Sequence, residues 1–90
     1  MKHVQLRIYG RVQHIGFRFH SMQVAYKYNV TGLVRNMDDG CVYIEAEGEN
    51  INIEKFIEWC KIGPMGARIE KFYMDEGDMK NYTSFEIDHI

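Results

Sequence analysis

A short glycine-bounded segment is the part of the sequence best suited to bind an anion. It runs from Gly10 to Arg18 and leads into an expected helix. Glycine lets successive backbone N–H groups curl around an anion, and the helix start adds unpaired N–H groups and a positive dipole. Arg18 falls in the first helical turn, where the dipole disfavours a cation unless an anion lies between them. Its guanidinium could hold two phosphate oxygens; a plain turn with a solvated arginine is the alternative.

Two familiar kinds of nucleotide site do not fit this segment. The Walker motif, GxxxxGK[ST], needs a lysine and a hydroxyl residue that the segment lacks, which disfavours a nucleoside triphosphatase. The GxGxxG pattern of dinucleotide-binding folds is missing as well. The segment therefore predicts a phosphate cradle of another kind.

A second candidate group is the amide of Asn36, at the end of an expected strand. The turn that follows is already specified by Asp38-Asp39-Gly40, although Asn36 capping its own backbone is the ordinary alternative. An amide is no base, but it can orient a water by accepting one hydrogen bond and donating another. Arg18, a backbone cradle and one amide suit a substrate that needs little chemical help. Acyl phosphates fit, because their leaving group is a carboxylate and phosphoryl transfer mostly needs positioning and charge neutralisation.

The elements that must position these groups alternate along the chain. Apolar residues at every second position predict strands at 4–9, 30–36, 42–47, 67–74 and 84–87. Helical spacing predicts helices at 17–28 and around 53–60. The order βαββαβ with one extra terminal strand is that of the ferredoxin-like, split-βαβ α+β fold, an antiparallel sheet with two helices on one face. In that topology the end of the second strand and the start of the first helix share a sheet edge, so Arg18 and Asn36 could face one pocket.

Length and charge narrow the possible functions. We expect a single domain over residues 1–90, since 90 residues leave no room for a second. A net charge of -2 disfavours general binding to nucleic acid or to an anionic membrane. No apolar run approaches the roughly 20 residues of a membrane helix, and the N-terminus lacks the layout of a secretory signal.

The two cysteines point to a reduced compartment. Cys41 and Cys60 form neither a CxxC pair nor a disulfide framework. We therefore expect a cytoplasmic protein with free thiols and no zinc or iron–sulfur site.

The same residues resemble the signature of the acylphosphatases. Two segments carry most of the likeness: Gly10-Arg11-Val12-Gln13-x-x-Gly16-Phe17-Arg18 and Gly32-Leu33-Val34-Arg35-Asn36-x-x-Asp39-Gly40-x-Val42. Shorter matches follow at 46–48, 63–64, 67–71 and 84–87. Blocks in this order and spacing cover nearly the whole chain, so the combination is specific.

The resemblance implies a function and a set of roles. It implies hydrolysis of a small acyl phosphate to a carboxylate and inorganic phosphate, by a cytoplasmic monomer that uses no metal or cofactor and no nucleic-acid or membrane partner. Arg18 would bind the phosphoryl group and Asn36 would position the attacking water. The loop would supply the substrate-binding residues Arg11, Val12, Gln13, His14, Ile15, Gly16 and Phe17.

Three positions depart from the family pattern. His14 stands where glycine is usual, so it would strain the loop if the position needs positive φ, add a titratable group, or simply point outward. Asn29 replaces a glycine after the first helix, a mild change because asparagine tolerates left-handed backbone. Cys41 replaces a small polar residue beside the hairpin. None of the three removes a residue with a proposed chemical role.

Two non-enzymatic hypotheses stay open. A domain of the same fold could bind carbamoyl phosphate or another acyl phosphate for a partner enzyme, although such domains usually begin long chains and this chain is short. An RNA-binding module is disfavoured by the missing aromatic RNP pattern and the acidic charge. Glu45, Glu47 and Glu49 are expected on a solvated strand face, outside the phosphate site.

Overall fold

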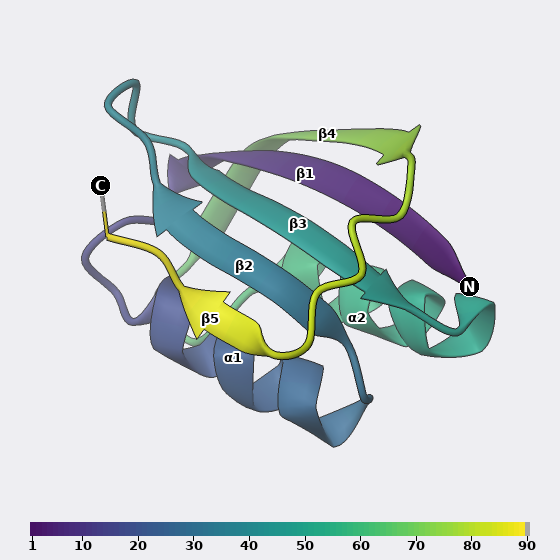
Figure 1. Cartoon of the computed structure of the whole chain (residues 1–90). Helices are drawn as coiled ribbons and strands as arrows, with labels where there is room; N and C mark the ends of the chain where they lie inside the picture. The colour runs from purple at the N-terminus through teal and green to yellow at the C-terminus, as the bar shows by residue number, and fades with distance from the viewer. Residues whose placement is uncertain (90) are drawn as a thin grey trace.

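The secondary structure follows the predicted order of strands and helices (Figure 1). The computed structural model describes residues 1–89. The elements are β1 (Lys2–Arg11), α1 (Phe17–Lys27), β2 (Thr31–Asn36), β3 (Val42–Gly48), α2 (Asn50–Ile62), β4 (Arg68–Gly77) and β5 (Phe85–Ile87). Within this part of the chain the strands form one sheet in the order β4-β1-β3-β2-β5.

The sheet is antiparallel apart from its last strand. β1 pairs antiparallel with β3 and β4, β2 pairs antiparallel with β3, and β5 runs parallel to β2. Both helices lie on one face of the sheet (Figure 1). This is the split-βαβ, ferredoxin-like α+β fold that the sequence predicts, with β5 as the additional short strand.

The core lies between the sheet and the two helices. Leu6 of β1 and Val34 of β2 both pair with Ile44 of β3, and all three side chains are fully buried. Ile53 and Phe56 of α2 are buried as well. Burying each such side chain contributes about 1.5–3 kcal/mol, which is why the two-residue and helical periods of the sequence fix these elements.

α1 packs through residues four positions apart. Its buried residues are Phe17, Ser21 and Ala25. The Ser21 hydroxyl donates to the Arg18 carbonyl oxygen at 2.9 Å, so the buried polar group is satisfied. Asn29 follows the helix with a φ of 54°, which confirms the left-handed turn expected there.

Several element boundaries differ from the expected ones by one to three residues, most of all the end of β4 and the start of α2. β4 continues to Gly77 because its backbone pairs along β1 as far as His3, although most of its side chains are exposed. α2 begins at Asn50, ahead of the apolar period that starts at Ile53. In both cases backbone hydrogen bonding extends the element past the residues that carry the apolar pattern.

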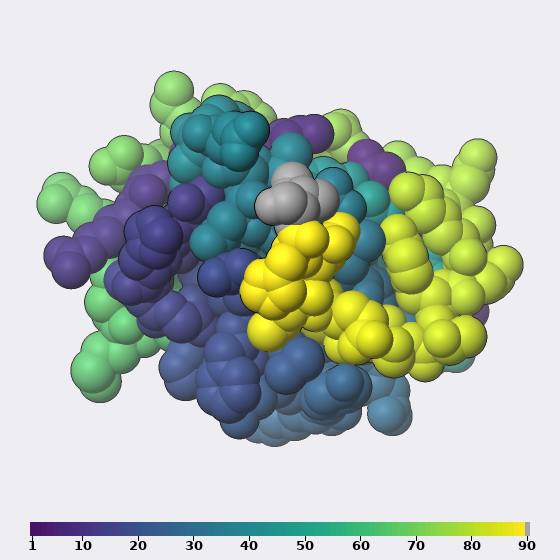
Figure 2. Space-filling model, turned by 60° about the vertical axis from the view of Figure 1, so that its left-hand side comes forward, coloured from purple at the N-terminus to yellow at the C-terminus, as the bar shows by residue number. Residues whose placement is uncertain are grey.

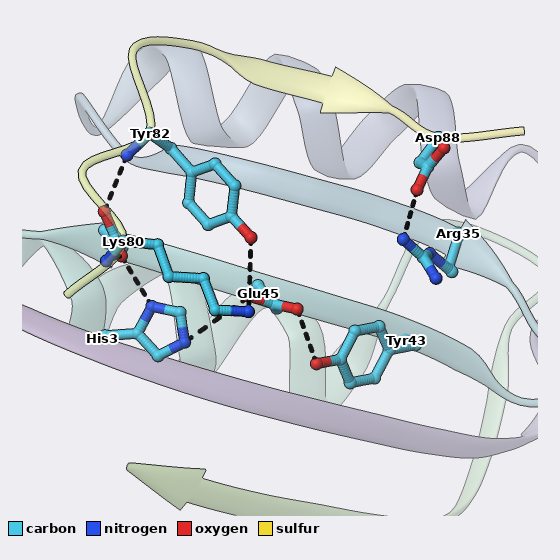
Figure 3. Close-up of polar contacts among 8 residues, drawn as sticks. His3, Arg35, Tyr43, Glu45, Lys80, Tyr82 and Asp88 are labelled. Carbon is cyan, nitrogen blue, oxygen red and sulfur yellow. Dashed lines mark hydrogen bonds and ion pairs between the residues drawn. The ribbon is translucent and has the colours of Figure 1, made fainter. Parts of the chain in front are cut away.

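The sheet face opposite the helices carries a buried polar cluster (Figure 3). The expectation that Glu45 and Glu47 are solvated is wrong: they are 6% and 1% exposed. The reason is that the segment between β4 and β5 folds back across this face and bonds to both carboxylates. Glu49 is exposed, as expected. We call the group the glutamate cluster; it consists of His3, Tyr43, Glu45, Glu47, Lys80 and Tyr82.

Glu45 is the best-partnered side chain of the glutamate cluster. Its carboxylate accepts hydrogen bonds from the hydroxyls of Tyr43 at 2.8 Å and Tyr82 at 2.7 Å, and pairs with the Lys80 ammonium at 2.8 Å (Figure 3). Burial raises the pKa of this carboxyl, but the bonds from Lys80, Tyr82 and Tyr43 outweigh it and bring the pKa down to about 2. Glu45 is therefore ionised at neutral pH and holds the covering segment in place.

Candidate active site

The segment between β1 and α1 is anchored at both ends by apolar side chains. Val12 and Phe17 are 1% and 2% exposed and belong to the core, and Ile15 packs partly against it. His14 and Gly16 between them are exposed. The apolar side chains thus fix this segment at the molecular surface. We call it the phosphate loop (residues 12–16), after the role that the sequence predicts for it.

The backbone of the phosphate loop is left-handed at two positions, a feature of the backbone nests that bind anions. His14 has a φ of 64° and Gly16 a φ of 81°, both left-handed. Left-handed residues between ordinary ones turn successive N–H groups toward one side. Position 14 therefore does take positive φ, which costs histidine some conformational energy and would cost glycine almost none. The His14 side chain is exposed, so it points outward from this strained backbone.

The start of α1 leaves N–H groups open next to the phosphate loop. Gly16 occupies the N-cap position just before Phe17, the first residue of α1, and no side-chain hydrogen bond from residues 1–89 caps this helix end. The first N–H groups of a helix have no intrahelical partner, and the dipole makes this end positive. Arg18 adds a guanidinium in the same turn. The arrangement concentrates positive potential at one point of a chain whose net charge is -2.

Asn36, the last residue of β2, has a side-chain oxygen that is free to bind a ligand. It pairs in the strand ladder with Val42 of β3. Its side-chain oxygen, Oδ1, is buried and has no hydrogen-bond partner among residues 1–89. A buried acceptor without a partner costs about 1–3 kcal/mol. Such an atom is typical of a group that a substrate or water completes.

The phosphate loop lies against the turn that follows Asn36. The Gln13 side-chain amide donates to the carbonyl oxygens of Met37 at 2.9 Å and of Cys41 at 3.0 Å. Figure 1 shows the end of β2 and the start of α1 on the same side of the molecule. The topology therefore places the loop, Arg18 and Asn36 at one sheet edge, as expected from the strand order.

A network around Asp39 stiffens this turn. The Asp39 carboxylate accepts from the backbone N–H of Cys41 at 3.1 Å and from the Tyr9 hydroxyl at 2.9 Å. The bond to Asp39 raises the pKa of Tyr9 to about 12, and the bond from the Cys41 N–H lowers the pKa of the Asp39 carboxyl. Sequence patterns indicated the turn through Asp39-Gly40 but gave no sign that Tyr9 of β1 reaches it.

The C-terminal segment also reaches the candidate site, which sequence reasoning missed. The guanidinium Nη1 of Arg18 lies 3.3 Å from Nδ1 of His89. Asp88 pairs with Arg35, the residue before Asn36 (Figure 3). Figure 2 shows this segment, in yellow, beside the dark blue residues of the loop and α1. No sequence signal links His89 to Arg18, because the contact depends on the pairing of β5 with β2.

The thiols of the two cysteines are not part of the candidate active site. Both are free and buried. Burial raises the pKa of the Cys60 thiol well above its usual range and also raises that of Cys41, which keeps both protonated. Among residues 1–89, no group of three or more His, Cys, Asp or Glu side chains is placed to hold a metal ion. No helix in the same part of the chain is both long and apolar enough to span a bilayer.

Known proteins are similar to this chain in sequence and in fold. The acylphosphatase family model matches residues 4–87. An acylphosphatase of Listeria welshimeri serovar 6b is 51% identical over 84 residues, which cover 91% of this chain and 90% of that protein. The crystal structure of acylphosphatase from Bacillus subtilis superposes with a TM-score of 0.95 at 31% identity and covers 99% of this chain and 100% of its own.

One similar structure is a much longer chain. Full-length HypF in its phosphate- and nucleotide-bound form matches with a TM-score of 0.92 at 37% identity. The match covers 98% of this chain and 12% of HypF. With the family model spanning residues 4–87 and a curated acylphosphatase similar over 90% of its own length, this chain belongs to the acylphosphatase family.

Proposed function

We propose that the protein is an acylphosphatase, which hydrolyses the carboxyl–phosphate bond of acyl phosphates to a carboxylate and inorganic phosphate. The observation that carries the proposal is one constellation: a left-handed phosphate loop opens into the uncapped start of α1 at Arg18, and Gln13 ties that loop to the turn after Asn36. Membership of the acylphosphatase family supports the same reaction.

In this mechanism the phosphoryl group is held by positive and hydrogen-bonding groups. Arg18 binds its oxygens with its forked N–H groups, and the backbone amides of the phosphate loop and of Phe17 bind the rest. The helix start adds the positive end of its dipole. Because the transition state spreads negative charge over the equatorial oxygens, these donors stabilise it more than the ground state.

Asn36 serves the attacking water. Its Oδ1 accepts a hydrogen bond from the water and directs the water oxygen at phosphorus, in line with the leaving carboxylate. The new P–O bond forms as the bond to the carboxylate oxygen breaks. The proton that the water loses passes to an oxygen of the phosphate product or to solvent. A carboxylate leaves without an acid, which is why no histidine or carboxyl group is needed in this role.

We further propose that the protein works in the cytoplasm as a monomer on a small acyl phosphate, as one domain over residues 1–90, without nucleic-acid or membrane partners. The two buried free thiols support a reducing compartment. The net charge of -2 supports a small-molecule substrate over a polyanion.

The test is phosphate release from acetyl phosphate by the wild type and by Arg18→Ala. Loss of the guanidinium should lower kcat/KM by about 10³-fold, because a transition-state charge loses its main donor. The matched control is Arg7→Ala, which makes the same change at an exposed position of β1. Equal activity in wild type and Arg18→Ala, or no activity in wild type, would refute the proposal.

A second candidate function is favoured by the match to HypF. There the same fold accounts for only 12% of a chain whose structure holds phosphate and nucleotide. This chain could accordingly bind carbamoyl phosphate or another acyl phosphate for a partner enzyme without hydrolysing it. Calorimetric titration with carbamoyl phosphate, alongside a phosphate-release assay, separates the two: tight binding without turnover favours the binding module.

A further inference from the structure

The side chain of Gln13 bridges the two halves of the candidate active site. We propose that Gln13 is a positioning residue: it fixes the water-orienting amide of Asn36 relative to the phosphate loop. The inference rests on the proposed function, since it assigns Gln13 a part in the same reaction. It concerns the contacts of the side chain within the protein, whereas the family resemblance implies only that Gln13 belongs to the substrate-binding loop.

The contacts of Gln13 show which atoms donate and which accept. Both partners, the carbonyl oxygens of Met37 and Cys41, are acceptors at 2.9 and 3.0 Å. Only the amide nitrogen of Gln13 can face them, and its two N–H groups supply one hydrogen bond to each. Met37 directly follows Asn36, and Cys41 directly precedes Val42, the residue that pairs with Asn36. The bridge therefore holds the turn on both sides of the last rung of β2 and β3.

The other hydrogen bonds of this turn do not involve the phosphate loop. Three are internal: Met37 N–H donates to the Cys41 carbonyl at 2.9 Å, Gly40 N–H donates to the Met37 carbonyl at 3.1 Å, and Cys41 N–H donates to the Asp39 carboxylate at 3.1 Å. The Tyr9 hydroxyl reaches Asp39 from β1, ahead of the loop. Within residues 1–89, Gln13 thus supplies the hydrogen bonds between the phosphate loop and the turn.

The position of Gln13 in the chain makes the bridge rigid. Its neighbour Val12 is 1% exposed in the core, and His14 on the other side holds a left-handed backbone. A half-buried amide between two fixed residues has little freedom to move. The carbonyl oxygens of the turn, and with them Asn36, are therefore set at a constant distance from the loop amides.

This distance matters for the rate rather than for phosphate binding. Arg18 and the loop amides hold the phosphoryl group, whereas Asn36 holds the water, so the attack requires both sides in register. A displacement of about 1 Å at a positioning group can cost on the order of 10²-fold in rate. Loosening the bridge should accordingly lower kcat and leave KM nearly unchanged.

The test removes the two donors while keeping the size of the side chain. Gln13→Leu should lower kcat about ten-fold, with KM within about two-fold of wild type. The control, Gln23→Leu, makes the same change at an exposed position of α1. In an Asn36→Ala background, Gln13→Leu should lower kcat by less than about two-fold, because the group that it positions is gone. An unchanged kcat, a rise in KM alone, or the same fall in both backgrounds would overturn the inference.

A second measurement reads the bridge itself. Backbone hydrogen exchange at Met37 and Gly40 should be about ten-fold faster in Gln13→Leu than in wild type or Gln23→Leu, since the turn opens more easily. Unchanged exchange rates at both residues would overturn the inference that Gln13 holds the turn. If Arg18→Ala abolishes activity and Gln13→Leu does not reduce it, only the inference fails; a wild type without activity would instead refute the proposed function.

Discussion

The candidate active site and the glutamate cluster are both polar, yet they treat their polar groups in opposite ways. In the cluster, Glu45 accepts from two tyrosine hydroxyls and an ammonium group. Glu47 accepts from His3 at 2.7 Å and from the Tyr82 N–H at 3.0 Å. In the site, by contrast, Asn36 keeps a buried oxygen without a partner, and the first N–H groups of α1 are uncapped.

The difference separates groups that hold the fold from groups available to a ligand. A buried carboxylate is tolerated only when its hydrogen bonds are complete, and burial and these bonds together set the pKa of Glu45 at about 2. Unsatisfied and strained groups cost stability, and they persist where a substrate completes them. The cluster has one exception, since Nε2 of His3 is buried without a hydrogen bond, 3.7 Å from Glu45.

The largest expected effect concerns the candidate active site, where polar groups lack partners within residues 1–89. Asn36→Ala should lower kcat by about 10²–10³-fold, because the water loses the group that orients it. Its free energy of unfolding should not fall by more than about 1 kcal/mol, since Oδ1 has no partner to lose. Acetyl phosphate kinetics and urea denaturation check the two quantities. A large loss of stability with full activity would erase the distinction between site and cluster.

The next largest effect concerns the glutamate cluster, where the carboxylates have their hydrogen bonds. Glu45→Gln should lower the free energy of unfolding by about 2 kcal/mol at neutral pH and leave kcat/KM unchanged. The folded pKa of about 2 lies below the ordinary value of 4.5, so the carboxylate stabilises fully above about pH 4.5 and loses this contribution as the pH falls toward 2. The stability gap between wild type and variant should therefore narrow over that range.

Urea denaturation at several pH values measures this gap. Glu54→Gln, an exposed change on α2, serves as the control and should show almost no gap at any pH. A gap between wild type and Glu45→Gln that stays constant down to about pH 2 would mean that the charge of Glu45 is not what stabilises the cluster.

The smallest effect concerns backbone strain in the phosphate loop. His14→Gly should raise the free energy of unfolding by up to about 1 kcal/mol, because glycine adopts the φ of 64° without strain. Asn29→Gly, at a φ of 54° after α1, should give a similar gain. Activity should stay within about two-fold in both, as checked by thermal unfolding and kinetics. A ten-fold loss confined to His14→Gly would instead place the imidazole in contact with the substrate.

Much of the fold was predictable because its elements carry their own signals. The alternation of Val4, Leu6 and Ile8 matches the buried face of β1, and the spacing of Ile53 to Cys60 matches the buried face of α2. β4 was predicted too short, since an edge strand with exposed side chains shows little apolar pattern. Glu45 and Glu47 were misassigned for a related reason: alternation tells which face a side chain takes, not what covers that face.

The sequence by itself determined the parts that depend on a few neighbouring residues: the glycine-bounded loop, the arginine in the first helical turn, and the turn at Asp39-Gly40. Backbone conformation and helix starts are set locally, so these signals can be read along the chain. Only the tertiary structure decided that Gln13 bonds to Met37 and Cys41, that His89 lies at Arg18, and that residues 78–84 cover two glutamates. Such contacts join residues tens of positions apart, and burial and hydrogen-bond partners at that range follow from how the whole chain packs.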